Sequence, residues 1–289
     1  MTEVYTVISS LEEEGVEVRS ACEVLDVSRS GYHQFQRAIV SERTKEDMRL
    51  RPLVQEVFLA HRRRYGARRI AKELAARGET CGRGRTRKIM DEMGLVAIQP
   101  RSFKPRTTDS RHTLGYNENV LLGARPPTDI NQVWVGDITY IPLRQSFGYL
   151  SMLMDLYSRM IVGWTLREHM REALVLSTLR QAIRTRQPTL DLIHHTDRGG
   201  QYAGAKYREV LDRAEMKQSM SRADNCYDNA FMESCFGTIK TELEINYYCT
   251  MSIALKEISE YINYFNVVRR HSAIDYKSPT QFELTVSQP

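Results

Sequence analysis

Three acidic side chains stand at positions where a carboxylate is unusual unless it does chemistry. Asp137 lies inside a β-rich run, Asp197 ends a short strand, and Glu233 lies on a predicted helix among apolar residues. Asp is depleted in β-strands, and a carboxylate is costly to bury without a partner. Carboxylates that converge from two strands and a helix can hold a pair of divalent cations, and their hard oxygen atoms suit Mg²⁺ or Mn²⁺. A single acid of this kind is more often a cap or turn residue, so the three must be judged together.

The spacing of the three acids favours a shared catalytic role. Asp137 and Asp197 are separated by 59 residues, and Asp197 and Glu233 by 35. Lys240 follows Glu233 by seven residues. It returns to the same face of a helix, because each residue turns the helix by about 100°. A lysine at this position is placed to bind a phosphate beside the metal site.

The motifs around these residues resemble those of the DDE transposases of the insertion sequence three family, whose core is similar to that of retroviral integrases. The matching segments are 134–141 (WVGDITYI), 195–202 (HTDRGGQY), 221–234, 264–266, 269–272, 278–279, 27–32 and 65–70. The resemblance therefore extends over most of the chain. Two features depart from the family. Asp224 stands where a small residue is usual, and no leucine heptad precedes the first predicted helix-turn-helix.

The resemblance implies a polynucleotidyl transferase with a ribonuclease H-like core. Asp137, Asp197 and Glu233 would be both its catalytic and its metal-binding residues, with two Mg²⁺ or Mn²⁺ ions per active site. Its substrates would be double-stranded DNA, namely the terminal inverted repeats of the element and a target. Cleavage would free a 3′-OH, which then attacks a second phosphodiester. Joining two ends implies at least a homodimer, and the family often uses a frameshift fusion with an upstream DNA-binding product.

The elements that position these residues are predicted to form a mixed α/β domain. β-rich runs predict a three-stranded meander at 133–141, 148–156 and 160–166, and a further strand at 190–195. Helical periodicity predicts helices at 171–186, 205–214, 229–247 and 252–265. The alternation predicts a mixed sheet with flanking helices. We expect the catalytic core at 128–250 and a C-terminal helical segment at 251–289.

All-α modules are predicted ahead of this core. Residues 18–37 predict a helix-turn-helix with Ala21, Val24 and Leu25 on its apolar face, inside a first segment at 1–42. Residues 44–95 show a second set of amphipathic helices separated by a turn, which predicts a second helix-turn-helix module at 43–96. Prolines and polar residues without periodicity then predict a basic linker at 97–127.

The positive charge is concentrated around the second module. The net charge is +5, yet residues 61–106 hold fourteen Lys and Arg against four Asp and Glu, and residues 131–289 balance to zero. Such a block indicates a nucleic-acid-binding module, although a solvated helix face has the same composition. Arg68, Arg69 and Lys72 are predicted phosphate contacts. The other predicted DNA contacts are Lys240, Arg198, Asn225, Tyr227, Asn229, Arg29, Arg270 and His271. For Asn229, capping of the catalytic helix is an equally good interpretation.

The histidines and cysteines are weaker candidates for catalytic or metal-binding residues. Only one of His194 and His195 shares its side of a strand with Asp197, which favours a structural or positioning role over a general base. Cys226 and Cys235 lack the paired ligands of a zinc site. Five scattered cysteines indicate a reducing compartment, and the sequence shows neither an apolar run of 18 residues nor a signal segment. We expect a cytoplasmic protein.

Two other classes of protein remain open. A ribonuclease H-like nuclease would hydrolyse nucleic acid without joining strands, and two helix-turn-helix modules argue against it. A DNA-binding regulator would have an inactive core, and the presence of all three acids with Lys240 argues against that class.

Overall fold

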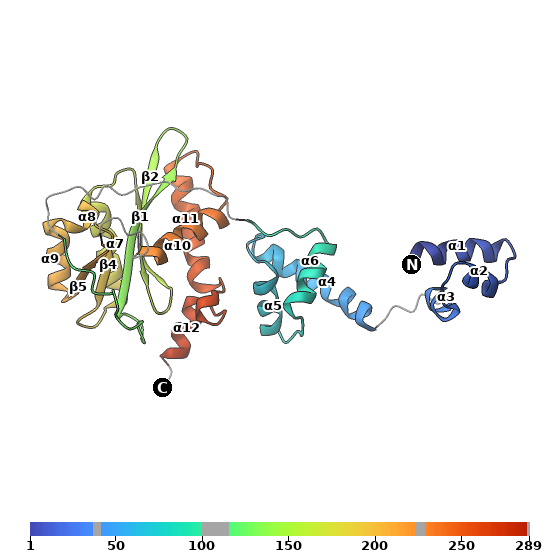
Figure 1. Ribbon diagram of the computed structural model, residues 1–289. Helices are drawn as coiled ribbons and strands as arrows, with labels where there is room; N and C mark the ends of the chain where they lie inside the picture. Colours follow the sequence, from blue (N-terminus) through green and yellow to red (C-terminus); the bar gives the residue numbers. More distant parts are fainter. Residues whose placement is uncertain (37–41, 100–115, 223–228, 288–289) are drawn as a thin grey trace. The chain divides into compact units, whose positions relative to one another are not determined.

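The chain divides into two compact units, Met1–Val96 and Ala97–Pro289. The computed structural model describes residues 1–36, 42–99, 116–222 and 229–287 (Figure 1). The first unit is entirely helical where it is described, and the second contains a five-stranded sheet. None of the helices in these ranges is long and apolar enough to cross a membrane.

The first three helices pack around a small apolar core. They are α1 (Thr2–Glu13), α2 (Val18–Val24) and α3 (Arg29–Gln36). Helices α2 and α3 match the helix-turn-helix predicted from the sequence, whereas α1 was not predicted. Ile8, Cys22 and Tyr32 are buried between the three helices. Val24, expected on the apolar face, is 83% exposed, so that part of the prediction is wrong.

The next three helices enclose a second core. They are α4 (Glu42–Ala60), α5 (Ala67–Ala76) and α6 (Arg83–Glu92). The fully buried aliphatic residues are Leu50, Val54, Val57, Ile70, Leu74 and Ile89. A buried acid, Asp47 on α4, accepts a hydrogen bond from the Arg85 guanidinium of α6, which joins the first and last of these helices.

The sheet of the second unit combines a meander with a parallel half. Its strands are β1 (Val133–Pro142), β2 (Phe147–Asp155), β3 (Ile161–Arg167), β4 (Ile193–Thr196) and β5 (Lys217–Met220), in the order β3-β2-β1-β4-β5. Strands β1, β2 and β3 pair antiparallel, as the predicted meander requires. Strands β4 and β5 run parallel to β1. The sequence did not predict β5.

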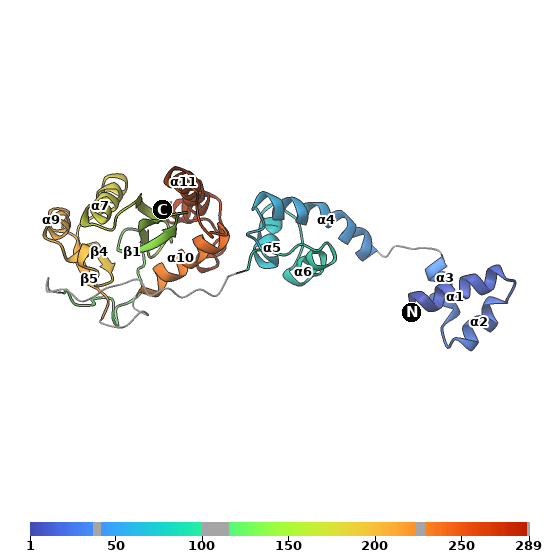
Figure 2. The same ribbon diagram turned by 90° about the horizontal axis from the view of Figure 1, so that it is seen from above.

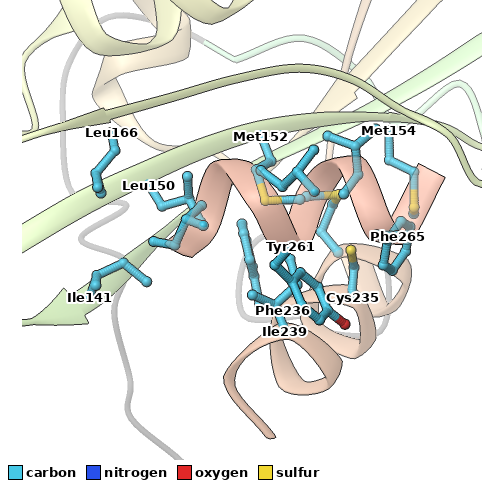
Figure 3. Close-up of a cluster of buried hydrophobic side chains, with 14 of the residues drawn as sticks. Ile141, Leu150, Met152, Met154, Leu166, Cys235, Phe236, Ile239, Tyr261 and Phe265 are labelled. Carbon is cyan, nitrogen blue, oxygen red and sulfur yellow. The ribbon is translucent and has the colours of Figure 1, made fainter. Parts of the chain in front are cut away.

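Helices cover both faces of the sheet (Figures 1 and 2). On one face lie α7 (Glu172–Arg186), α8 (Gly200–Ala203) and α9 (Ala205–Arg213), packed on Trp134 and its neighbours. On the other lie α10 (Ala230–Glu242) and α11 (Met251–Val267), whose Phe236 and Tyr261 pack against Leu150 and Met152 of β2 (Figure 3). Helix α10, which carries Glu233, is thus fixed to the sheet by a continuous apolar layer.

Hydrogen bonds join the first and last described segments of the second unit to its sheet and helices. The last elements are a 3-10 helix, η2 (Ser272–Ile274), and α12 (Pro279–Val286). Glu283 of α12 accepts two hydrogen bonds from the Arg186 guanidinium of α7. At the other end, the backbone N–H of Val120 donates to Ser219 Oγ on β5 at 3.1 Å, and the N–H of Met220 donates to the carbonyl of Glu118 at 3.3 Å. The last part of the segment expected as a linker is therefore packed along β5.

Candidate active site

The register between β1 and β4 brings the two aspartates together. Val133 lies opposite Ile193 and Val135 opposite His195 in this parallel pair. Two residues further along the same register, Asp137 falls beside Asp197, which directly follows β4. Equivalent positions on neighbouring strands point to the same face of a sheet. Two acids far apart in sequence therefore become neighbours.

The electrostatics of Asp137 agree with this placement. Burial raises the pKa of its carboxyl group well above the ordinary value, and the negative charges of Asp197 and Glu233 raise it further. The backbone N–H of Ile138, 2.7 Å from Asp137 Oδ1, and the Lys240 ammonium oppose the shift. Both aspartates keep a partly exposed side chain. The pair is therefore accessible, and its mutual repulsion favours a bound cation.

Lys240 lies close enough to Asp137 for the two charges to interact. Its ammonium donates to Thr139 Oγ1 on β1 at 2.7 Å. Thr139 is two residues after Asp137 and so shares its side of the strand. Burial lowers the pKa of Lys240, and the negative charge of Asp137 counteracts this. Thr139 was missed at the sequence level, although the alternation of side chains along a strand could have indicated it.

Glu233 lies on the exposed side of the first turns of α10. The same helix buries Met232, Phe236 and Ile239 against the sheet. Phe231, an apolar neighbour of Glu233 in the sequence, is 45% exposed, and the Arg159 guanidinium lies over its ring, 4.7 Å from the ring centre. The Glu233 charge acts on Asp137 from this side.

Asn229 anchors the start of α10 to β1. It is 4% exposed and its Nδ2 donates to the carbonyl oxygen of Gly136 at 3.4 Å. Its side chain makes no capping hydrogen bond to the helix. Neither of the two roles considered from the sequence, a DNA contact or a helix cap, describes its observed contact. Because Gly136 precedes Asp137, this bond holds α10 next to the candidate site.

The donor set fits a hard divalent cation only in part. Asp137 and Asp197 offer adjacent carboxylate oxygens, the ligands that Mg²⁺ and Mn²⁺ prefer. Within the described ranges, however, no three His, Cys, Asp or Glu side chains are gathered closely enough to hold a metal ion. The structure therefore brings the two aspartates together and leaves Glu233 as a nearby third acid.

Neither histidine before Asp197 is free to act as a general base. Both are fully buried. His194 Nε2 lies 2.7 Å from the Tyr207 hydroxyl, and burial lowers the pKa of His194 to about 3. His195 bonds Ser219 Oγ at 2.8 Å and Ser221 Oγ at 3.2 Å. These contacts agree with the structural role favoured from the sequence.

A buried ion pair that the sequence did not predict fixes the other end of α10. Glu242, the last residue of this helix, is 7% exposed and Arg269 is 4% exposed. Arg269 Nη2 donates to Glu242 Oε1 at 2.6 Å, and the Tyr261 hydroxyl donates to Glu242 Oε2 at 2.9 Å. Since Glu242 is nine residues after Glu233, it lies on about the opposite face of the helix.

Two residues predicted to contact DNA lie close to this ion pair in the sequence, and both make contacts within the protein. His271 is 9% exposed and its ring packs edge-on against Phe265, with centroids 4.4 Å apart. Arg270 donates to the carbonyl oxygen of Tyr276 at 2.9 Å. Their side chains hold the turn that follows α11, because their polar atoms bind within the protein.

The other predicted DNA contacts differ in accessibility. Arg29 on α3 and Arg68 and Lys72 on α5 are exposed. The Arg69 guanidinium lies over the ring of Tyr65, 5.6 Å from its centre. Arg198 donates to the Ser221 carbonyl oxygen at 2.8 Å and lies over the ring of Tyr116 at 4.7 Å. Asn225, Tyr227 and the unusual Asp224 fall outside the described residues.

Comparison with known proteins defines the class of this fold and site. Two Integrase core domain models match residues 127–226 and 214–279, and an HTH-like domain model matches residues 45–103. The chain is also similar to a chain of the simian T-cell lymphotropic virus intasome in complex with PP2A regulatory subunit B56 gamma. The TM-score is 0.50 at 16% identity, covering 82% of this chain and 76% of that one. The second unit has the ribonuclease H-like fold of integrase catalytic cores, as predicted.

Relatives in sequence narrow the class to a family. The chain is 39% identical over 263 residues to the insertion element IS600 uncharacterized 31 kDa protein of Shigella sonnei, covering 90% of this chain and 96% of the relative. It is 39% identical to the transposase for insertion sequence element IS904 of Lactococcus lactis (88% and 97%). It is 34% identical to the transposase InsF for insertion sequence IS3A of Escherichia coli (92% and 93%). The chain belongs to the insertion sequence transposases with an integrase core, which are DDE polynucleotidyl transferases.

Proposed function

We propose that the chain cleaves DNA at the ends of its element and joins the freed 3′-OH to a second phosphodiester at the centre formed by Asp137, Asp197 and Glu233. The observation that carries this assignment is the β1–β4 register, in which Val135 lies opposite His195 and which, continued by two residues, sets Asp137 beside Asp197. The raised pKa of Asp137, caused by burial and by the charges of Asp197 and Glu233, supports it. One such centre serves both steps, because both are in-line displacements at phosphorus.

The acidic residues of the site bind metal ions, and its lysine binds DNA. Asp137 and Asp197 would hold one divalent ion, and Asp137 and Glu233 would hold the other. Two bound Mg²⁺ or Mn²⁺ ions would supply activation of the attacking oxygen and stabilisation of the leaving 3′ oxygen. Lys240 binds a DNA phosphate beside the carboxylates, since Thr139 holds its ammonium next to Asp137.

The DNA substrate is held by other parts of the chain as well. Exposed Arg68 and Lys72 on α5, with Arg69, contact phosphates and position the duplex without reading its sequence. Arg29 gives the first helix-turn-helix a similar contact. Asn225 and Tyr227, which precede α10 in the sequence, are further DNA contacts.

Bringing two element ends together requires at least a homodimer on DNA. As the family resemblance implies, one strand end attacks the same strand beyond the other end, giving a figure-eight and then a circle that is inserted into a target. An upstream frameshift-fused product completes end recognition, and the reaction takes place on cytoplasmic DNA.

A supercoiled plasmid that carries the DNA flanking this gene in its genome tests the function. The protein is added with Mg²⁺ or Mn²⁺, and the products are separated by size and topology. Joined products support the proposal. Nicks without joining would indicate a nuclease, and a shifted band without cleavage would indicate a regulator. Replacing Glu233 by Gln should abolish both cleavage and joining while DNA binding persists.

A further inference from the structure

We propose that α6 is the helix that reads DNA sequence, with Arg83 and Arg87 contacting base edges in the major groove. This inference rests on the proposed function, in which the chain acts at specific element ends, and names the surface that distinguishes those ends. It differs from the phosphate contacts assigned to α5, which carry no sequence information.

One group of basic residues in or next to α4, α5 and α6 is bound within the protein. Its ion pairs are Arg49 with Glu46 and Glu79, Arg51 with Glu92, Arg77 with Glu56, Arg85 with Asp47, and Lys88 with Asp47 and Glu92. Among them Arg85 is the most constrained, because its partner Asp47 is 6% exposed. These cations neutralise neighbouring acids and link the three helices.

The second group faces outward from α6. Arg83 and Arg87 are exposed and lie one helical turn apart, so they share a face. Arg85, bound to α4, lies about 200° around the helix from Arg83. Within residues 42–99, the side chain of Arg83 makes no ion pair or hydrogen bond with another described residue. Arg87 has a single pair, to Asp91 at 3.6 Å, in which the side chains are 71% and 69% exposed. Exposed pairs of this kind contribute little and exchange readily.

A glycine between these arginines has no explanation inside the protein. Gly84 lies in the first turn of α6, and a Cβ at this position would meet nothing within 4 Å. Its φ is not positive, so the backbone does not require glycine. Glycine inside a helix is destabilising relative to alanine. The neighbouring Gly82 is equally open. The absence of side chains on this exposed turn allows a partner to approach the backbone closely.

Duplex DNA is the partner whose chemistry matches this face. The major groove admits an α-helix, and a guanidinium can donate two hydrogen bonds to O6 and N7 of one guanine. The face is cationic, as a polyanion requires. Arg83 and Arg87 are separated by about 6 Å along the helix, which corresponds to about two base pairs. The preferred site should therefore contain two guanines about two base pairs apart.

A selection with the full chain from a random-sequence duplex library tests the inference. The wild type should enrich a motif with two such guanines. Arg83→Ala with Arg87→Ala should reduce the ratio of motif to random-DNA affinity at least about tenfold. The matched control, Arg49→Ala with Arg77→Ala, removes the same charge from bound arginines and should keep the motif. Arg83→Lys with Arg87→Lys keeps the charge, so the salt dependence should persist while the motif weakens. Enrichment of an unchanged motif by the Arg83 and Arg87 variants would overturn the inference.

Gly84→Ala separates recognition from folding. The added methyl group should raise the thermal stability of α6, because alanine favours the helix. It should weaken motif binding by roughly tenfold, because the helix can no longer approach the bases as closely. A variant that is more stable and binds the motif as well as the wild type would contradict close approach. Strand joining, measured separately with a pre-cleaved end, reports on the proposed function. An unchanged motif in the Arg83 and Arg87 variants, together with joining by the wild type, would contradict this inference alone. Failure of the wild type to join DNA while it still selects the motif would contradict the proposed function alone.

Discussion

Replacing Asp137 by Asn should stabilise the second unit at neutral pH in the absence of divalent ions. In the folded protein, burial and the charges of Asp197 and Glu233 hold the pKa of Asp137 well above its ordinary value of 3.8, to which it returns on unfolding. Between these two pKa values the folded protein keeps one more proton than the unfolded chain. The contribution of this group to stability is therefore complete below pH 3.8 and is lost as the pH rises through the folded-state pKa.

The size of the effect follows from that one proton. A difference of one bound proton changes the free energy of unfolding by about 1.4 kcal/mol per pH unit. The Asn variant keeps the shape of the side chain but does not titrate. Between pH 3.8 and the folded-state pKa of Asp137, the free energy of unfolding of the wild type should therefore fall by about 1.4 kcal/mol more per pH unit than that of the variant.

Urea unfolding followed by tryptophan fluorescence measures this directly. The chain has two tryptophans, Trp134 on β1 and Trp164 on β3, so the signal reports on the second unit alone. Asp212→Asn, an exposed change on α9, is the matched control and should leave the slope unchanged. Added Mg²⁺ at one hundred times its Kd should stabilise the wild type by about 2.7 kcal/mol, and the Asp137 variant by much less. An Asp137→Asn protein with the wild-type pH slope, or one less stable at every pH, would refute the reasoning.

Three further predictions concern the framework of the site. Glu242→Gln should lower the free energy of unfolding by about 3–5 kcal/mol, because it leaves a buried arginine uncompensated; a loss below about 1 kcal/mol in urea unfolding would argue against it. A chain beginning at Tyr116 should be more stable than one beginning at Thr128 by at least about 1 kcal/mol, because the shorter chain loses the hydrogen bonds along β5; equal midpoints by circular dichroism would contradict this. Gly163→Ala should destabilise the unit by about 1–3 kcal/mol, since its Cβ would lie 2.7 Å from a carbonyl oxygen of α7. The control Gly237→Ala, which has open space, should not destabilise it.

The local patterns in the sequence predicted much of the fold. The meander strands carry β-rich runs long enough to be recognised, and the long helices α7 and α11 carry clear periodicity. Strand β5 was missed because its four residues, Lys217 to Met220, have no apolar alternation and form a strand only by pairing with β4. Helix α10 ends at Glu242 rather than at residue 247, since the residue after which a helix stops depends on tertiary contacts.

The site was predictable in its residue types but not in its contacts. Asp137, Asp197 and Lys240 could be chosen from spacing and motif, whereas the register that joins the two aspartates is a property of the sheet. Asn229 and His271 look like DNA contacts because polar side chains in motifs often bind ligands. Their burial becomes visible only when Gly136 and Phe265 are placed beside them. No local pattern distinguishes such a polar residue from an exposed one.

The amount of joined DNA formed by Asp197→Cys in Mg²⁺ and in Mn²⁺ tests the central claim most directly. If Asp197 is a ligand of the catalytic ion, a softer sulfur atom should abolish joining with Mg²⁺ and allow part of it with Mn²⁺. Asp212→Cys, an exposed change on α9, should join DNA like the wild type with either ion. Joining by the Asp197 variant at the wild-type level in Mg²⁺ would contradict a metal-binding carboxylate at this position.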